Sequence, residues 1–276
     1  MNDGLFDLSG SVAAVIGATG VLGGAIAEGL ASHGASVAVI GRNADRGEAR
    51  AAAINRQGGQ AFFVSADALS RPSLESAREA IEQRLGPCDV LVSAAGGNNP
   101  RASVTEEQAF TDLPLDAWRE NFDTNLVAGA LLPAQVFGGA MVDRAQNDPS
   151  RRGSIINIAS IASHVPVSRG VAYSAAKAAL RNLSMFLARE WALRGVRVNT
   201  ITPGFFPAEQ NMRLLFNPDG TPTPRGQQAL DRTPMARFGD PGELVGAAVY
   251  LASHRASGFV TGADLVVDGG YLSSTL

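Results

Sequence analysis

Short, continuously apolar runs alternate with longer amphipathic stretches along the whole sequence. The short runs, rich in Val, Ile and Ala, predict seven β-strands: Val12–Ile16, Ser36–Ile40, Ala61–Ser65, Val90–Ala94, Ser154–Ile158, Arg197–Thr202 and Leu265–Asp268. Strands without polar alternation are typically covered on both faces, which indicates a parallel sheet. Right-handed crossovers then give a single doubly wound (Rossmann-type) α/β domain over 1–276, with ligands beyond the carboxyl ends of the strands.

Helical periodicity fills the intervals between these strands. The predicted helices are Leu22–Ser32, Arg46–Arg56, Ser73–Leu85, Leu115–Arg144, Ala172–Leu193 and Gly242–Ser253. Pro133 is expected to kink the fourth of them, because proline lacks the N–H that the helix needs there. Two segments interrupt the alternation of predicted strands and helices, the loop Gly96–Pro114 and an insertion at about 205–240. The length of the insertion is typical of a lid over a site.

Composition narrows the class of protein. A net charge of −3 and a pI near 5.7 argue against a role in binding nucleic acid or a membrane surface. A single cysteine, Cys88, excludes an internal disulfide. The segment Met1–Gly10 lacks the charged and apolar regions of a secretory signal, and no uncharged apolar stretch has the length of a bilayer span. We therefore expect a cytoplasmic protein.

Ser160, Tyr173 and Lys177 have the spacing of a hydride-transfer site. Tyr173 and Lys177 stand four residues apart at the start of an Ala-rich helical run, so both lie on one helix face. A neighbouring ammonium favours the phenolate, and we expect it to lower the pKa of Tyr173 toward neutrality. Ser160 follows a predicted buried strand, where its hydroxyl is placed to donate to a substrate oxygen. Tyr-x-x-x-Lys alone is common on surface helices, so a hydride-transfer site is indicated only if the sequence also contains cofactor-binding motifs.

A glycine-rich loop joins the first strand to the first helix, in the sequence Gly17-Ala-Thr-Gly20-Val-Leu-Gly23. Glycines at such a turn let the backbone approach a pyrophosphate at the helix N-terminus. The turn itself is the alternative explanation, but the position between strand and helix favours a nucleotide site. The cofactor-binding residues expected here are Gly17, Thr19, Gly20, Val21, Leu22 and Gly23.

The end of the second strand carries Arg42 and Asn43 and has no carboxylate before Asp45. An NAD site favours an acidic residue at this place, whereas an arginine accepts a 2′-phosphate. NADP is therefore predicted as the cofactor and NAD is the alternative, with a solvated Arg42 as the other explanation.

Residues after the third and fourth strands complete the predicted cofactor site. Asp67, followed by Ala68, is placed to accept from the adenine amino group, although a helix cap explains an Asp equally well. Gly96, preceded by Ala94 and Ala95, lets the backbone pass close to the cofactor.

Taken together, these motifs resemble the short-chain dehydrogenase/reductase family over nearly the whole chain, including Pro203-Gly204 and Val267-Asp268-Gly269-Gly270. The resemblance implies a catalytic tetrad of Asn125, Ser160, Tyr173 and Lys177. In it, Ser160 orients the substrate carbonyl and Tyr173 passes the proton. Lys177 holds the nicotinamide ribose, and Asn125 anchors a water. Ile16, Ser93 and the position of Gly20 depart from the usual family pattern, which affects the grip on the cofactor rather than the tetrad.

The loops are similar to those of the D-mannonate oxidoreductase (fructuronate reductase) subgroup, which implies a sugar-acid substrate. Amides suit its hydroxyls and guanidiniums suit its carboxylate. The candidate substrate residues are Asn98, Arg101, Arg169, Gln210, Asn211 and Arg213. Each is also explained as an ordinary loop residue, and His164 as a loop histidine with a backbone partner.

Several alternatives remain open. Within the enzyme class they are a gluconate or polyol dehydrogenase and, further away, a 3-oxoacyl-carrier-protein reductase. From another class, a dinucleotide-binding regulator without turnover fits everything except the tetrad. No Cys/His cluster predicts a metal site. The family resemblance further implies a homotetramer joined through the long fourth and fifth helices and the C-terminal segment.

Overall fold

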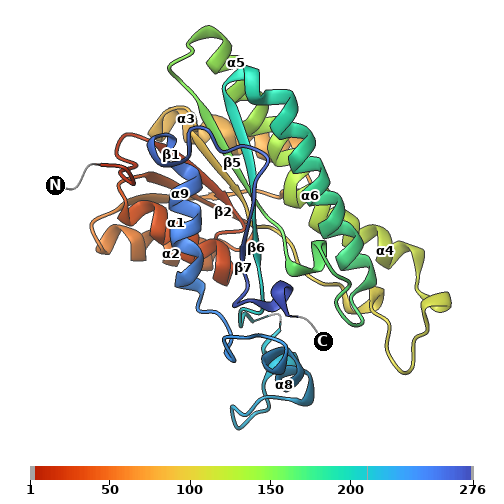
Figure 1. Ribbon diagram of the computed structural model, residues 1–276. Helices are drawn as coiled ribbons and strands as arrows, with labels where there is room; N and C mark the ends of the chain where they lie inside the picture. The colour runs from red at the N-terminus through yellow and green to blue at the C-terminus, as the bar shows by residue number, and fades with distance from the viewer. Residues whose placement is uncertain (1–3, 210, 275–276) are drawn as a thin grey trace.

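The computed structural model describes residues 4–209 and 211–274, which form a seven-stranded sheet covered by helices on both faces (Figure 1). The strands are β1 (Val12–Ile16), β2 (Ser36–Gly41), β3 (Gln60–Ser65), β4 (Val90–Ser93), β5 (Gly153–Ile158), β6 (Val196–Pro203) and β7 (Asp264–Val267). Every neighbouring pair is parallel, in the order β3-β2-β1-β4-β5-β6-β7. The predicted doubly wound parallel sheet is confirmed, and each strand matches its predicted bounds within one residue at each end.

Ten α-helices connect and cover these strands within the described part of the chain. They are α1 (Val21–Ser32), α2 (Ala44–Arg56), α3 (Arg71–Leu85), α4 (Leu115–Phe122), α5 (Gly139–Asn147), α6 (Val171–Trp191), α7 (Met212–Leu215), α8 (Pro224–Asp231), α9 (Val245–Ala252) and α10 (His254–Ser257). Side-chain caps fix two of the starts: Asn43 accepts from the Arg46 N–H at 2.9 Å, and Ser70 accepts from the Ser73 N–H at 3.3 Å.

The apolar character of the strands follows from two cores, one on each face of the sheet. Ala13 and Val15 of β1 pack with α1, α2 and α9, whereas Ala14 and Ile16 pack with α3, α5 and α6. Figure 1 shows these two helical layers on opposite sides of the sheet. Because alternate side chains of one strand enter different cores, no position of β1 is free to be polar.

The predicted helix Leu115–Arg144 is found as one helical stretch over Leu115–Asn147 with a π-helical interior. The π segments are Asp123–Leu131 and Ala134–Gly138, and they flank Pro133, which itself keeps helical angles (φ −53°, ψ −46°). The departure expected at Pro133 thus takes the form of a change in hydrogen-bond register, with the chain remaining helical through the proline.

The expectation that no stretch has the length of a bilayer span is wrong for this helix, which is the one described helix long and apolar enough to cross a membrane. However, 61% of its apolar window is buried inside the protein. Its apolar residues, such as Phe137 and Met141, belong to the core on the α3, α5 and α6 face. The helix is therefore a core helix of this fold.

The insertion at about 205–240 contains two short helices that the apolar pattern does not predict, α7 and α8. A single antiparallel bridge between Phe216 and Pro222 joins the chain between them. Thr223 caps α8 by accepting from the Gly226 N–H at 3.0 Å, and Pro224 occupies its first turn. Thr-Pro is a helix-start signal, so α8 had a local signature that hydrophobic periodicity alone misses.

Candidate active site

A cavity of about 650 Å³ opens at the carboxyl ends of β1 to β4, where a doubly wound sheet binds its ligands. Its size falls in the range of small-molecule and cofactor sites. Twelve of the predicted cofactor residues line it: Gly17, Thr19, Gly20, Val21, Leu22, Gly23, Arg42, Asp67, Ala68, Ala94, Ala95 and Gly96. The lining also includes residues that the sequence reasoning missed, namely Ile16, Gly41, Arg46, Ala66, Leu69, Thr124, Ala128, Ile158, Ala208 and Glu209.

The glycine loop is packed too tightly to admit side chains. Gly17 has φ +84°, and a Cβ on it would lie 2.7 Å from the backbone carbon of Ala94. A Cβ on Gly23 would lie 2.5 Å from the Gly17 carbonyl oxygen. Gly20 caps α1 and has no side chain to occupy the first N–H groups of the helix, which remain available at the cavity. A backbone cradle at a helix N-terminus fits the pyrophosphate of a dinucleotide.

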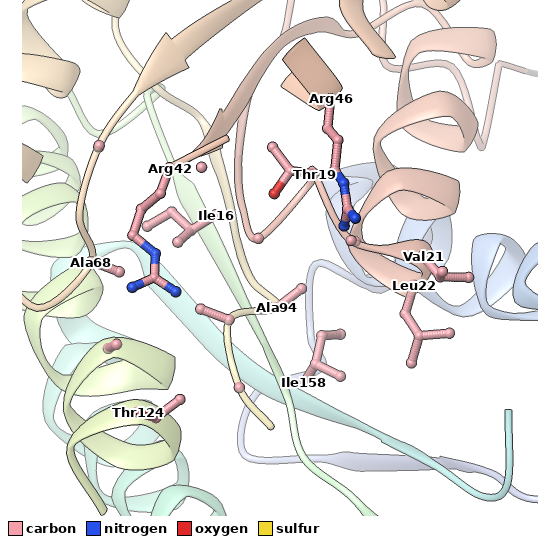
Figure 2. A pocket seen from close by; sticks show the side chains of 18 of the residues that line it. Ile16, Thr19, Val21, Leu22, Arg42, Arg46, Ala68, Ala94, Thr124 and Ile158 are labelled. Carbon is pink, nitrogen blue, oxygen red and sulfur yellow. The ribbon is translucent and has the colours of Figure 1, made fainter. Parts of the chain in front are cut away.

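Two arginines extend into this cavity from the end of β2 and the start of α2 (Figure 2). Arg42 is exposed and makes no side-chain hydrogen bond or ion pair with the described residues. Arg46 lies 2.8 Å from the Glu209 carboxylate, which belongs to the insertion. Asn43 does not line the cavity; its side chain caps α2 instead. Cationic side chains therefore border the place where β2 ends.

Asp67 lies at the cavity and does not cap α3, since Ser70 has that role. The Asp67 carboxylate accepts from the Leu69 N–H at 3.0 Å, and the Asp67 N–H donates to the Ser73 hydroxyl at 3.0 Å. These bonds fix the turn after β3 and hold the carboxylate at the cavity edge. The helix-cap explanation for Asp67 is thereby excluded.

Asn125 is fully buried in the π-helical segment and fastens the loop after β4. Its amide nitrogen donates to the Gly97 carbonyl at 2.7 Å, and its Oδ1 accepts from the Gly97 N–H at 3.0 Å. The same nitrogen lies 2.9 Å from both the backbone and the side-chain oxygen of Asn121. A polar residue within a helix is explained here by these contacts, and Asn121 is a partner that the sequence reasoning missed.

Gly96 brings the cavity wall against the residues of the predicted tetrad. A Cβ on Gly96 would lie 2.9 Å from Asn125 Oδ1 and 3.1 Å from Lys177 Nζ. Lys177 is 4% exposed, donates from Nζ to the Ile158 carbonyl at 2.9 Å, and lies 5.8 Å from the centre of the Tyr173 ring. The predicted Asn, Tyr and Lys side chains are thus gathered beside the wall that Gly96 and Ile158 give to the cavity.

Ser160 lies next to Tyr173 at the carboxyl end of β5. Burial raises the pKa of Tyr173 above its ordinary value, and contact with the Ser160 hydroxyl opposes that rise. Burial also lowers the pKa of Lys177 to about 8. The expected lowering of the Tyr173 pKa by an ammonium neighbour is therefore wrong for this structure, because desolvation dominates both groups.

Pro203 and Gly204 end β6 outside the lining of the nucleotide cavity. The Gly204 N–H donates to the Val267 carbonyl at 2.9 Å, and a Cβ on Gly204 would lie 2.7 Å from Asp268 Cα. Packing against the end of β7 accounts for this glycine without a ligand.

The predicted substrate residues lie in different surroundings. Asn98 donates to the Ser103 hydroxyl at 2.9 Å, and Asn211 bridges the Ala208 N–H and the Phe206 carbonyl within the insertion. Arg101 lies 2.5 Å from the Asp116 carboxylate, which occupies its guanidinium. The structure gives these three side chains partners within the fold, whatever further role they have.

The other predicted substrate residues have weaker contacts or none among the described residues. Arg213, in α7, is exposed and has no side-chain partner among the described residues. Arg169 has a positive φ of 70° and lies 3.7 Å from the Glu106 carboxylate. Gln210 lies outside the described residues. The His164 side chain contacts Asp264, with 2.6 Å between its Nε2 and the carboxylate. The partner of this histidine is therefore a side chain and not the backbone.

No group of three or more His, Cys, Asp or Glu side chains suited to a metal ion occurs in residues 4–209 and 211–274. A dinucleotide-type cavity beside a Ser–Tyr–Lys group defines an oxidoreductase that transfers a hydride. Comparison with known proteins leads to the same class. A family model described as enoyl-(acyl carrier protein) reductase matches residues 17–272.

The chain belongs to the short-chain dehydrogenase/reductase family, and it is an NAD(P)-dependent dehydrogenase acting on CH–OH groups. It is 42% identical to an uncharacterised oxidoreductase, UxuB, of Bacillus subtilis, over 97% of this chain and 96% of that protein. A Haemophilus influenzae structure with bound NAD, provisionally assigned as a D-mannonate oxidoreductase, has a TM-score of 0.90 at 35% identity, covering 99% of both chains. A gluconate 5-dehydrogenase from Burkholderia cenocepacia, in complex with NADP and tartrate, has a TM-score of 0.86 at 30% identity, covering 98% of both chains.

Proposed function

We propose that the protein interconverts a sugar-acid ketone and its alcohol with NADP(H), D-fructuronate and D-mannonate being the expected pair. The observation that carries this proposal is the place of Gly96, whose Cα faces the cofactor cavity on one side and Asn125 and Lys177 on the other. In this proposal the nicotinamide lies against Gly96, next to Asn125 and Lys177.

A nicotinamide held in the cavity supplies or accepts the hydride. Ser160 donates a hydrogen bond to the substrate oxygen, where negative charge grows as the ketone is reduced. The Tyr173 phenol gives that oxygen its proton, and in the reverse direction it takes the proton from the alcohol. The Lys177 ammonium, whose pKa lies near 8, is the proposed source of the proton that replaces the one Tyr173 loses. Asn125 holds the Gly97 backbone and with it the wall of the cavity.

The substrate class is supported by the relatives. One similar structure is provisionally assigned as a D-mannonate oxidoreductase and another is a gluconate 5-dehydrogenase, so both relatives are named for sugar-acid chemistry. A gluconate 5-dehydrogenase activity is accordingly the second candidate. A polyol is the third candidate, since one relative is a D-threitol dehydrogenase. An acyl-carrier-protein substrate or a purely regulatory role explains fewer of these features.

The preference for NADP is supported by Arg42, whose exposed guanidinium extends into the cavity without a partner among the described residues. A 2′-phosphate there gains charge-assisted hydrogen bonds that a ribose hydroxyl does not. The relatives differ in this respect, since one binds NAD and the other NADP.

Steady-state oxidation of NADPH and of NADH, followed by absorbance, tests the proposal with fructuronate, tagaturonate, 5-ketogluconate and an acetoacetyl thioester. Turnover of fructuronate above the others supports the expected pair, and preference for 5-ketogluconate favours the second candidate. Turnover of the thioester alone, or of none while NADPH binds, contradicts the proposed function.

We also propose a cytoplasmic homotetramer joined through α4 to α6 and the C-terminal segment. Exposed apolar side chains on α6, including Phe186 (59% exposed) and Met185 (49%), support burial of this face between subunits.

A further inference from the structure

Arg225 ties the insertion to the loop that precedes the catalytic helix. It lies in α8 and donates from Nη2 to the Ser168 carbonyl, 57 residues earlier in the chain, at 3.0 Å. A guanidinium has five N–H donors, and this bond uses one of them. The side chain is half-buried, and no carboxylate of the described residues lies within ion-pairing distance of it. Its remaining donors are therefore available to a ligand.

Arg169 follows Ser168 and has an unusual backbone. Its φ of +70° is a conformation that glycine adopts freely and other residues rarely adopt. The Arg169 carbonyl accepts from the Val104 N–H at 2.9 Å, which holds the loop in this shape. Its guanidinium lies 3.7 Å from Glu106, whose side chain is 90% exposed, so this pair is loose and solvated. Backbone strain of this kind gathers at ligand sites.

The bond from Arg225 to the Ser168 carbonyl brings α8 against the residue that precedes Arg169. The pKa of Arg225 is lowered, first by burial and next by the charge of Arg169, whereas Tyr271 opposes this shift. Tyr271 in turn packs edge-on against Phe205, which follows β6, with 5.4 Å between ring centres. Figure 1 shows α8 and the C-terminal segment at the same end of the molecule, beyond the carboxyl ends of β6 and β7. Arg169 is also only four residues before Tyr173.

We propose that Arg169 and Arg225 bind the carboxylate of the substrate. This carboxylate is at the end of the substrate remote from its ketone, and the ketone faces Ser160 and Tyr173. Arg225 has no carboxylate partner among the described residues, and Arg169 has only the loose, solvated pair with Glu106. Two such neighbouring cations favour an anionic group between them, and a planar carboxylate matches the fork of a guanidinium. The assignment rests on the proposed sugar-acid function and gives it an anion-binding subsite. It adds Arg225, in the insertion, as a specificity residue.

The test compares D-fructuronate with D-fructose, which carries CH₂OH in place of the carboxylate. Arg225→Gln and Arg169→Gly are expected to raise KM for fructuronate roughly 10–100-fold, the effect of losing a charged hydrogen bond. The kcat/KM for fructose should change less than about twofold. Arg225→Lys keeps the positive charge without the fork of the guanidinium. Its KM for fructuronate should lie between those of the wild type and Arg225→Gln. Arg232→Gln, at the exposed C-terminal end of the same helix, is the matched control and should alter neither substrate.

Equal losses of kcat/KM with fructuronate and with fructose would mean that Arg225 only fastens the insertion. Unchanged KM values for fructuronate would also overturn the subsite. If the wild-type protein reduces neither compound, the sugar-ketone function fails by itself. The subsite is then tested by calorimetric binding of D-gluconate and D-glucitol to the protein saturated with NADPH. If the wild type binds gluconate more tightly than glucitol and Arg225→Gln abolishes this difference, the subsite is supported. If the wild type binds both ligands equally, the subsite is contradicted.

Discussion

At the scale of single residues, spacing predicts which side chains meet but not how their charges behave. The four-residue interval between Tyr173 and Lys177 and the Ser160 that follows a strand are local features, and the structure brings all three together. The pKa of Tyr173, however, moves in the direction opposite to the one predicted from an ammonium neighbour. Burial is a property of the whole fold, so its dominance over the neighbour's charge is not readable from spacing.

Lys177 should cost folding stability at neutral pH. Its pKa falls from 10.5 in the unfolded chain to about 8 in the folded protein, so the unfolded state binds more protons between these values. Stability from this group therefore rises with pH through that interval and is lowest below it. We expect Lys177→Met to unfold at higher urea concentration at pH 7, gaining about 1–3 kcal/mol after the lost hydrogen bond to Ile158 is counted.

The gain should shrink by pH 10, and a gain that is constant with pH would contradict the assigned pKa. Lys177 is the single lysine in the sequence. Its titration can therefore be followed directly by NMR after reductive methylation, with only the α-amine as a second signal.

Tyr173→Phe should remove turnover while leaving nucleotide binding intact, because the phenol is the proton donor. A loss of about 10²–10⁴-fold in kcat is expected for a general acid. NADPH affinity, measured by fluorescence, should change less than about threefold, since the aromatic ring remains and only the hydroxyl is lost. Tyr250→Phe in α9 is the control, and retained turnover in the Tyr173 variant would refute its role.

Arg42→Ala should raise KM for NADPH by about 10–100-fold and leave KM for NADH nearly unchanged, since only the former has a 2′-phosphate. Arg46→Ala should have a smaller effect, because its guanidinium is shared with Glu209. Arg56→Ala, at the exposed end of α2, serves as the control. Equal losses for both nucleotides in Arg42→Ala would show that the arginine does not read the phosphate.

At the scale of elements, hydrophobic patterning predicts the regular part of the fold well. All seven strands and the six long helical stretches lie where apolar periodicity places them, since each has a face or two that must be buried. The helices α7 and α8 escape this reasoning, because short helices in a polar insertion bury few residues. The π-helical register around Asn125 also has no apolar signature, although it determines how that side chain meets Gly97.

Gly23→Ala should damage the cofactor site through the join between β1 and α1. The added Cβ would meet the Gly17 carbonyl, a backbone atom that moves only if the loop moves. We expect NADPH affinity to fall at least about tenfold while circular dichroism remains that of the wild type. Gly246→Ala, a helical glycine in α9 with open space around it, should leave affinity unchanged. Similar affinity in both variants would mean that the loop is not a close-fitting cradle.

At the scale of the whole molecule, function depends on contacts between segments far apart in sequence. The pair Arg46–Glu209 joins the insertion to the start of α2, and the bond from Arg225 to Ser168 joins it to the loop before α6. One sequence carries no signal that pairs such residues. Sequence reasoning therefore predicted the glycine loop and the Asn125, Ser160, Tyr173 and Lys177 group from local motifs but left the substrate end as a set of unconnected arginines.

The exposed apolar face of α6 leads to a prediction about assembly. Phe186→Glu should reduce the molar mass measured by light scattering from that of a tetramer to that of a smaller species, because a carboxylate is costly to bury between subunits. Arg189→Glu, on the same helix, is the control for a change of charge alone. A wild-type protein that is monomeric at micromolar concentration would contradict the proposed tetramer.

The central position of β1 has a consequence for biosynthesis. This strand is synthesised before both of its partners, since it pairs with β2 and β4, and β4 is synthesised more than 70 residues later. Until then one edge of β1 has no partner and Gly17 lacks the Ala94 backbone against which it packs. The nascent chain must therefore carry an unfinished nucleotide loop and an apolar strand edge while these 70-odd residues are synthesised, the interval in which a chaperone is most useful to it.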